Sequence, residues 1–217
     1  MPLIDDWGLI SYREAWEGQK MLFNKLIAEQ DTEERIILCE HPPVYTLGFH
    51  GNEANLIADR ERLEAMGAEC IRIERGGDIT FHGPGQLVVY PIINLHRHKL
   101  GVKAYIELLE ESVRELLLKY GIKSSSNNEA IGVWLDWKTS KARKICAIGV
   151  KISHGITMHG LALNVNTDLD AFKMINPCGI LDKGVTSMSR ELGYELNMDR
   201  VKTKLSEIIV NKLSDSK

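Results

Sequence analysis

The sequence lacks the features that direct a chain into or across a membrane. It opens on acidic residues, with no positively charged segment ahead of an apolar run and no arginine-rich, acid-poor leader. We therefore expect neither a secretory signal nor a transit peptide. The longest apolar runs are also far shorter than a membrane span. These absences predict a cytoplasmic protein with no membrane partner.

Cysteine is scarce, and its spacing does not suggest a metal site. Cys39, Cys70, Cys146 and Cys178 are far apart, and no two of them form a Cys-x-x-Cys pair. The sequence therefore predicts no zinc and no other metal. In a reducing cytoplasm the four residues would be free thiols, of which at most one or two need a chemical role.

Strong net charge and internal divisions are also missing. The 217 residues carry a formal charge of −3, so there is no global basic field for nucleic acid. No Gly-x-x-x-x-Gly-Lys-Ser/Thr phosphate loop, repeat, low-complexity tract or Ser/Gly/Pro-rich linker occurs. Because 44% of the residues are hydrophobic, enough for one substantial core, we expect a single domain over residues 1–217.

Hydrophobic spacing predicts helices mixed with strands. Some strands follow one another without an intervening helix, which implies antiparallel pairing with helices packed on the sheet. The expected class is therefore α+β, or mixed α/β. The predicted helices are Tyr12 to Ala28, with Ser11 as N-cap, Ala54 to Met66, Val102 to Tyr120 and Asp199 to Leu213. The predicted strands are Arg35 to Cys39, Val44 to Phe49, Glu69 to Ile73, Leu87 to Ile93, Gly132 to Asp136, Lys144 to Ile152 and Thr157 to Val165, with a hairpin loop over Trp137 to Arg143.

The segment Arg75 to Gln86 combines four glycines, a proline and a histidine. Glycine allows positive φ and close approach of a ligand to the backbone, and Pro84 fixes one turn. Because strand-like runs flank the segment, it is typical of a binding loop held between elements of a sheet. The alternative is a rigid turn without function, although one Gly-Pro pair would suffice for that.

A second unusual turn, Asn176-Pro177-Cys178-Gly179, carries a thiol. Reactive thiols favour such positions, but free cysteine is also among the most buried residue types. Lys144 has a similar ambiguity: it shares a strand face with Cys146 and Ile148 that looks buried, yet its ammonium can extend to solvent. If Lys144 lies beside Cys178, the ammonium stabilises the thiolate. A pKa two units lower than about 8.5 requires about 2.7 kcal/mol, which one close cation can supply.

Three histidines are candidates for acid–base chemistry. His82 belongs to the glycine-rich segment, where a site role and a structural hydrogen bond are both open. His159 begins the run His-Gly-Leu-Ala, in a predicted strand that could line the same binding site as the glycine-rich segment. His154 lies in the turn Ser-His-Gly, where a solvated loop residue is the expected outcome.

Four motifs together resemble one enzyme family, the octanoyl-acyl carrier protein:protein octanoyltransferases of lipoate biosynthesis. The resemblance extends in order from about Leu38 to Arg190. The motifs are Arg-Gly-Gly-x-x-Thr-Phe-His-Gly-Pro-Gly-Gln from Arg75, Lys-Ile-Cys-Ala-Ile-Gly from Lys144, His-Gly-Leu-Ala-Leu-Asn-Val-Asn from His159 and Ile-Asn-Pro-Cys-Gly from Ile175. One small departure is Phe81, where tyrosine is common in the family.

The resemblance implies a biotin/lipoate ligase-like fold, a mixed sheet flanked by helices. It implies that Cys178 is the acyl-thioester nucleophile and Lys144 its catalytic partner, with no cofactor and no need for ATP. It also implies an acyl pocket lined by Arg75, Gly76, Gly77, Asp78, Ile79, Thr80, Phe81, His82, Ala147, Ile148, Gly149, His159, Gly160, Leu161 and Ala162.

The implied partners are octanoyl-acyl carrier protein as donor and, as acceptors, the lipoyl domains of 2-oxoacid dehydrogenase E2 subunits and the H protein of glycine cleavage. We expect a monomer. Because both partners are typically acidic, His96 to Lys99 with Lys103, and Lys138 to Lys144, are candidate docking patches. The alternatives are an ATP-dependent lipoate or biotin ligase of the same fold, an amidotransferase between lipoyl domains, and a silent binding module. Two residues favour the transferase. Asp78 stands where a third consecutive glycine would resemble the ligase pattern, and Cys178 is present as a nucleophile that the ligases do not need.

Overall fold

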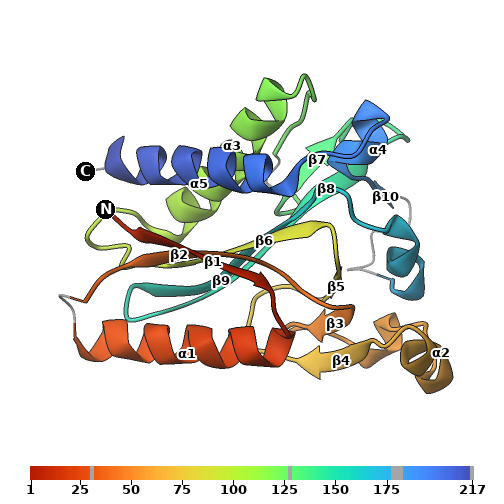
Figure 1. Ribbon diagram of the computed structural model, residues 1–217, viewed down its shortest axis with the longest axis horizontal. Helices are drawn as coiled ribbons and strands as arrows, with labels where there is room; N and C mark the ends of the chain where they lie inside the picture. The colour runs from red at the N-terminus through yellow and green to blue at the C-terminus, as the bar shows by residue number, and fades with distance from the viewer. Residues whose placement is uncertain (30–31, 127–128, 177–182, 216–217) are drawn as a thin grey trace.

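The computed structural model describes residues 1–29, 32–126, 129–176 and 183–215. A twisted sheet separates two helical layers (Figure 1). Helix α1 (Tyr12–Ala28) covers one face, and helices α3 (Val102–Lys119) and α5 (Met198–Asp215) cover the other. Among the helices of these ranges, none combines the length and the apolar content that crossing a membrane requires.

The larger sheet is mixed. In the described part of the chain its strand order is β1-β2-β6-β9-β8-β10, with β7 also paired to β8. The pairs β1–β2 and β8–β10 are parallel, and the others are antiparallel. The strands are β1 (Leu3–Leu9), β2 (Arg35–Glu40), β6 (Gln86–Ile92), β7 (Val133–Leu135), β8 (Arg143–Ser153), β9 (Ile156–Asn164) and β10 (Gly184–Val185).

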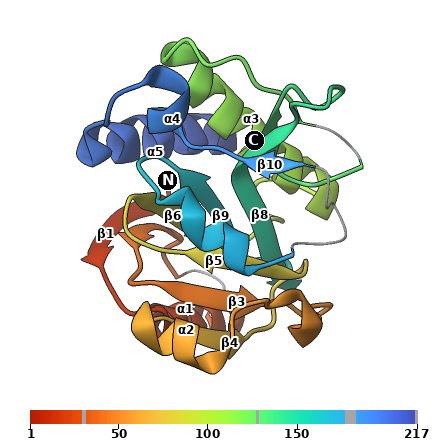
Figure 2. The same ribbon diagram turned by 90° about the vertical axis from the view of Figure 1, so that its right-hand side faces the viewer.

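A smaller sheet lies on the side of α1, with α2 (Arg60–Ala65) next to it (Figure 2). Its order is β4-β3-β5, formed by β3 (Val44–Leu47), β4 (Glu69–Arg72) and β5 (Ile79–His82). The 3-10 turns η1 (Glu53–Asn55) and η2 (Leu169–Met174) and the short helix α4 (Met188–Leu192) complete the described elements.

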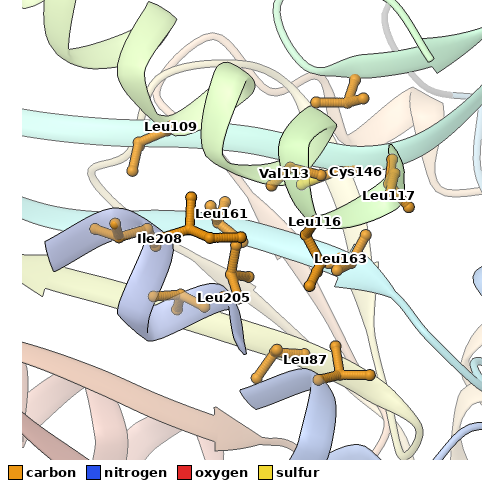
Figure 3. Close-up of a cluster of buried hydrophobic side chains, with 14 of the residues drawn as sticks. Leu87, Leu109, Val113, Leu116, Leu117, Cys146, Leu161, Leu163, Leu205 and Ile208 are labelled. Carbon is orange, nitrogen blue, oxygen red and sulfur yellow. The ribbon is translucent and has the colours of Figure 1, made fainter. Parts of the chain in front are cut away.

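The main core lies between the larger sheet and helices α3 and α5 (Figure 3). Leu109, Val113, Leu116 and Leu117 of α3 are fully buried there, at the spacing of one helical face. Each such side chain contributes roughly 1.5–3 kcal/mol when it leaves water. This core fixes the positions of β6, β8 and β9, three of the strands that contribute to the cavity wall.

Several predicted elements are confirmed. Ser11 caps α1, since its Oγ accepts a hydrogen bond from the Glu14 N–H at 3.3 Å. Gly67 and Gly121 follow α2 and α3 with positive φ, as expected of glycines that end helices. The predicted hairpin between residues 132–136 and 144–152 is also present, because β7 and β8 pair antiparallel.

The predicted helix Ala54 to Met66 is wrong in its first half. Helix α2 begins only after Asp59, whose side chain caps it by accepting from the Arg62 N–H. Before that point, Leu56 forms a bridge with Ile175, and the N–H groups of residues 57 and 58 donate to the Met174 carbonyl. These backbone groups are engaged by a distant segment, so a helix cannot form there.

The glycine-rich segment contains a strand that its composition concealed. Residues 79–82 form β5 and pair with β3 in full register, from Leu47↔Ile79 to Val44↔His82. The first strand, β1, was also not predicted, and it pairs in parallel with β2. Pairing with a partner far along the chain, rather than local propensity, produces both strands.

Candidate active site

A cavity of about 630 Å³ lies between the two sheets. This volume is within the range of small-molecule sites, roughly 300–1,000 Å³. Its wall includes these expected pocket residues: Arg75, Gly76, Gly77, Asp78, Ile79, Thr80, His82, Ala147, Ile148, Gly149, His159, Gly160, Leu161 and Ala162. Phe81 is described but lies outside the wall, packed against Tyr45 and Phe172. Because side chains alternate along β5, Phe81 points away from Thr80 and His82 and belongs to the buried cluster with Tyr45 and Ile79.

The glycines of residues 75–77 let this loop close against β8. The Gly76 N–H donates to the Val150 carbonyl at 3.1 Å. A Cβ on Gly149 would lie 2.9 Å from the Gly76 carbonyl oxygen, so a larger residue would force the loop away. Gly77 has φ +87°, a conformation that favours glycine. The loop therefore forms a side wall of the cavity.

Arg75 is a buried structural cation in that wall. Its guanidinium donates to the Thr46 carbonyl at 2.6 Å, to the Thr46 Oγ1 at 2.9 Å and to the Gly76 carbonyl at 3.0 Å. These bonds tie the glycine loop to β3. A planar group with several donors suits this position better than a lysine, whose single ammonium could not make the same set.

His82 lies inside a hydrogen-bonded chain. The Gln86 amide nitrogen donates to the Phe81 carbonyl and to Asn164 Oδ1, so its Oε1 is left as the acceptor for His82 Nδ1, at 2.7 Å. His82 Nε2 therefore carries the lone pair and faces Thr46 Oγ1 at 3.4 Å. Burial lowers the pKa of His82 to about 3. It is thus a neutral imidazole with both nitrogens engaged, an arrangement that positions the wall rather than transferring protons.

Asp78 connects the cavity to the segment before Cys178. Its carboxylate accepts from the Asn52 N–H at 3.0 Å and from the Asn55 side-chain amide. The Asn55 carbonyl in turn accepts from the Asn176 N–H at 2.7 Å. A side chain on the glycine-rich loop therefore fixes the chain two residues ahead of the predicted nucleophile.

Lys144 also lines the cavity. It lies in β8 opposite Trp134 of β7, with its Nζ 4.6 Å from the centre of the Trp134 ring. The pairing of β7 with β8 shifts by one residue between Lys144 and Cys146, and Cys146 is enclosed in the core. The predicted common face of these two residues is therefore interrupted.

Cys178 lies outside the described residues. Ile175 before it and Lys183 after it both line the cavity, so the chain leaves and re-enters the described part at the cavity wall. The other three cysteines are free, and burial raises the pKa of each thiol. In the part of the chain that the structure describes, no group of three His, Cys, Asp or Glu residues is arranged to hold a metal ion.

Sequence reasoning missed a second polar cluster at the cavity. Tyr12 of α1 and Tyr90 of β6 both line it. The Tyr90 hydroxyl is 2.8 Å from His41 Nε2, and His41 Nδ1 is 2.8 Å from the Ile10 carbonyl oxygen, to which it donates. Burial lowers the pKa of His41 to about 4. The only local signal in the sequence is the position of His41 directly before Pro42 and Pro43, which indicates the end of a strand and no site.

The two predicted docking patches differ in how exposed their residues are. His98 is buried, with Nε2 2.9 Å from Glu34 Oε2, so it cannot belong to a surface patch. Its segment contacts the turn between β8 and β9 through a Leu95–Gly155 hydrogen bond, at the opposite end of β8 from Lys144. Lys138 and Lys141 are exposed in the connection that leads into β8. His154 is exposed in its turn, as predicted.

The family model and the similar sequences agree on one family. The family model of the lipoyl protein ligase A/B catalytic domain matches residues 11–210. An octanoyltransferase of Bacteroides fragilis is 55% identical over 204 residues, covering 92% of this chain and 92% of that protein. An octanoyltransferase of Parabacteroides distasonis is 45% identical over 210 residues, covering 94% and 95%. A bipartite lipoate protein ligase of Thermoplasma acidophilum matches with a TM-score of 0.72 and 14% identity, over 98% of this chain and 84% of that one. The last likeness confirms the predicted fold.

Proposed function

The chain belongs to the lipoyl protein ligase A/B catalytic domain family and is an acyltransferase, and we propose that it transfers an octanoyl group from octanoyl-acyl carrier protein to a lysine of a lipoyl domain. One catalytic domain spans residues 1–217 in this proposal. The observation that carries it is a cavity with Lys144 in its wall and with the residues on both sides of the Cys178 segment in that wall.

The first half-reaction forms an octanoyl-enzyme. The Cys178 thiolate attacks the thioester carbon of the donor, a new carbon–sulfur bond forms and the old one breaks, and the carrier's sulfur leaves as a thiol with a proton from the Lys144 ammonium, which becomes a neutral amine. A nearby ammonium, which we assign to Lys144, favours the thiolate over the thiol. A pKa lowered by two units corresponds to about 2.7 kcal/mol, which one close cation can supply.

The second half-reaction forms the product. The lysine amine of the lipoyl domain attacks the octanoyl-thioester, the carbon–sulfur bond breaks, and an amide replaces the thioester. Lys144 accepts the proton that the amine loses. The conversion of a thioester to an amide is downhill, so neither ATP nor another cofactor is required. The acceptors in this proposal are E2 lipoyl domains and the glycine-cleavage H protein.

The cavity supports an acyl substrate. Ala147, Ile148, Leu161 and Ala162 supply apolar wall between Lys144 and the inner end. A buried methylene gains about 0.8 kcal/mol, so a medium chain obtains several kcal/mol from this wall. The bound chain would hold the thioester carbon at the Lys144 end, where the chemistry takes place.

Intact-protein mass spectrometry tests the proposal. The protein is mixed with octanoyl-acyl carrier protein without ATP, as wild type, Cys178→Ser and the control Cys70→Ser. Cys70 is a half-buried thiol in β4 outside the cavity wall. We expect a hydroxylamine-labile octanoyl adduct on wild type and Cys70→Ser, and none on Cys178→Ser.

The ATP-dependent ligase is the alternative, and the same samples separate the two. A ligase would form no adduct on wild type and would still lipoylate a lipoyl domain with ATP after Cys178→Ser. That pair of results would reject the thioester route and make Lys144 a residue that binds an acyl-adenylate.

A further inference from the structure

Strand β10 is a short part of the cavity wall directly beside Lys144. It pairs in parallel with β8, so that Gly184 lies opposite Arg143 and Val185 lies opposite Lys144. The Thr186 N–H donates to the Lys144 carbonyl at 2.9 Å. Gly184, Val185 and Lys144 all line the cavity. The pairing of β10 with β8 therefore determines how the wall beside Lys144 is built.

The backbone pairing of β10 is too short to be strong by itself. The strand has 2 residues, whereas strands in globular proteins usually have at least about three. The net contribution of one backbone hydrogen bond to stability is also small, because the same groups bond to water when the strand detaches. A further contact is needed to keep β10 in place against β8.

The ion pair of Arg143 with Glu191 is such a contact. Arg143 donates from Nε to Glu191 Oε1 at 2.7 Å and from Nη2 to Glu191 Oε2 at 2.6 Å. Two parallel bonds between a guanidinium and a carboxylate are stronger and more directional than one. The same carboxylate accepts from the hydroxyl of Thr186, the residue that directly follows β10. One carboxylate therefore connects β8 to the end of β10.

This connection is anchored and partly shielded from solvent. Glu191 belongs to α4, and Met188 of that helix is fully buried in the main core. The side chains of Arg143 and Glu191 are only 27% and 18% exposed, so water screens their attraction less than that of a surface pair. The hydrogen bond from Arg143 holds the pKa of Glu191 below its ordinary value. The carboxylate is therefore charged near neutral pH.

Arg143 acts on the wall from the other side of the strand. Because side chains alternate along β8, Arg143 and Lys144 point to opposite faces. Of these two residues, only Lys144 lines the cavity. The charge of Arg143 is balanced by Glu191 and by Asp136, which belongs to the connection after β7. Its influence on the cavity therefore passes through the position of the backbone.

We propose that Arg143 and Glu191 are positioning residues for the acyl transfer, because their ion pair holds β10 on β8 and thereby fixes the cavity wall beside Lys144. This inference rests on the proposed function. β10 is also the first described strand after Cys178. The pair therefore fixes the point at which the chain returns from Cys178 to the strand of Lys144.

Loss of the ion pair should affect the rate of the reaction more than the binding of the donor. The acyl chain meets the apolar wall of residues 147, 148, 161 and 162, and none of these belongs to β10. The reacting groups, by contrast, depend on the wall beside Lys144. A displacement of about 1 Å between reacting groups can lower a rate about 100-fold. We therefore expect a lower maximal rate and an unchanged half-saturating donor concentration.

Amide hydrogen exchange tests the structural part of the proposal without any reaction. The groups observed are the N–H of Gly184 and of Thr186, which donate to the carbonyls of Ala142 and Lys144. We expect Arg143→Met and Glu191→Gln each to speed the exchange of these two groups at least tenfold. Unchanged exchange in both variants would overturn the proposal, because β10 would then keep its place without the ion pair.

Single-turnover acylation by octanoyl-acyl carrier protein tests the functional part. Arg143→Met and Glu191→Gln should each lower the maximal rate at least tenfold and change the half-saturating donor concentration less than about threefold. The double variant should be no slower than Arg143→Met, because both changes remove the same link. Additive losses would overturn the proposal. A higher half-saturating concentration with an unchanged maximal rate would also overturn it, since the pair would then serve donor binding.

A second ion pair in the chain provides a matched control. Arg35 pairs with Asp5 at 2.7 Å, with side chains 30% and 23% exposed, and it likewise joins two parallel strands, β1 and β2. Neither residue is in the cavity wall. Arg35→Met should lower the stability to urea about as much as Arg143→Met, yet keep the acylation rate within about threefold of wild type. An equal loss of rate would overturn the proposal in favour of general destabilisation.

The outcomes can be separated from those of the proposed function. If Arg143→Met does not fold, Glu191→Gln keeps the shape of its side chain and still decides both experiments. Failure of wild type to form the octanoyl-enzyme would reject the proposed function. The exchange of Gly184 and Thr186 would still show whether the ion pair holds β10 on β8.

Discussion

Acid should unfold this protein through its buried histidines. In an unfolded chain each imidazole titrates near pH 6.5. In the folded protein, burial holds the pKa of His41 at about 4 and that of His82 and His159 at about 3. Between these values the unfolded state binds more protons, so the free energy of unfolding falls as the pH falls. The stability is fully present above about pH 6.5 and is lost progressively below it.

The magnitude follows from the number of groups. One imidazole that stays neutral only in the folded state changes the free energy of unfolding by about 1.4 kcal/mol per pH unit. Three of them give about 4 kcal/mol per pH unit between roughly pH 6 and pH 4.5. A domain of ordinary stability has only 5–15 kcal/mol in total. We therefore expect a free energy of unfolding about 4 kcal/mol lower at pH 5.5 than at pH 7.5.

Urea unfolding at a series of pH values measures this slope. The matched variants are His159→Asn and His154→Asn, since both residues have left-handed backbones, at φ +60° and +54°, but only His159 is buried. His159→Asn should reduce the slope by about one third, and His154→Asn should leave it unchanged. The reasoning is refuted if His159→Asn keeps the full slope, or if both variants reduce it equally.

Two further predictions concern the reaction. Asp78→Ala and Asn55→Ala should each slow formation of the acyl-enzyme about tenfold, because the hydrogen bond between the two side chains holds the Asn55 backbone carbonyl that accepts from the Asn176 N–H. The double variant should be no slower than Asp78→Ala, and additive losses in stopped-flow mass spectrometry would contradict this. Charge reversal of the exposed Lys138 and Lys141, in the connection that leads into the strand of Lys144, should raise the KM for the carrier protein several-fold at low salt. Reversal of the distant Lys99 serves as the comparison. Equal effects on KM would argue against a local docking surface.

The long helices could be predicted because their own sequences determine them. Helices α1, α3 and α5 each have apolar residues at helical spacing, and burial of that face is what stabilises them. Their ends are also local, since Ser11 caps α1 and Gly121 ends α3. Periodicity and capping act within a few residues, so a single sequence contains the information.

Elements that depend on distant partners could not be predicted in this way. Residues 56–58 have helix-forming composition but pair with residues 174–175 instead. Residues 79–82 lie among glycines yet form a strand, because β3 offers a complete set of backbone partners. In both cases the competing interaction comes from another part of the chain, and local propensity is too weak to oppose it.

The candidate site could also be predicted only where the signal is local in the sequence. The glycine-rich motif indicated residues 75–82, and most of them do line the cavity. No local pattern indicates that Thr46 joins Arg75 to His82, or that Gln86 sets the tautomer of His82. Motifs identify the residues near a ligand, whereas hydrogen bonds between distant residues determine which of them can still titrate.

That distinction limits what each histidine at the cavity can do. His41 and His82 are neutral and have partners on both ring nitrogens, so a proton reaching either one must break a hydrogen bond as well as charge a buried ring. Such groups stabilise the wall but are poor general bases near neutral pH. Lys144 is half-buried in the wall of the same cavity, and it is the side chain to which the proposed reaction assigns proton transfer. In the proposed reaction His41 and His82 therefore hold the cavity wall in place, and proton transfer is assigned to Lys144.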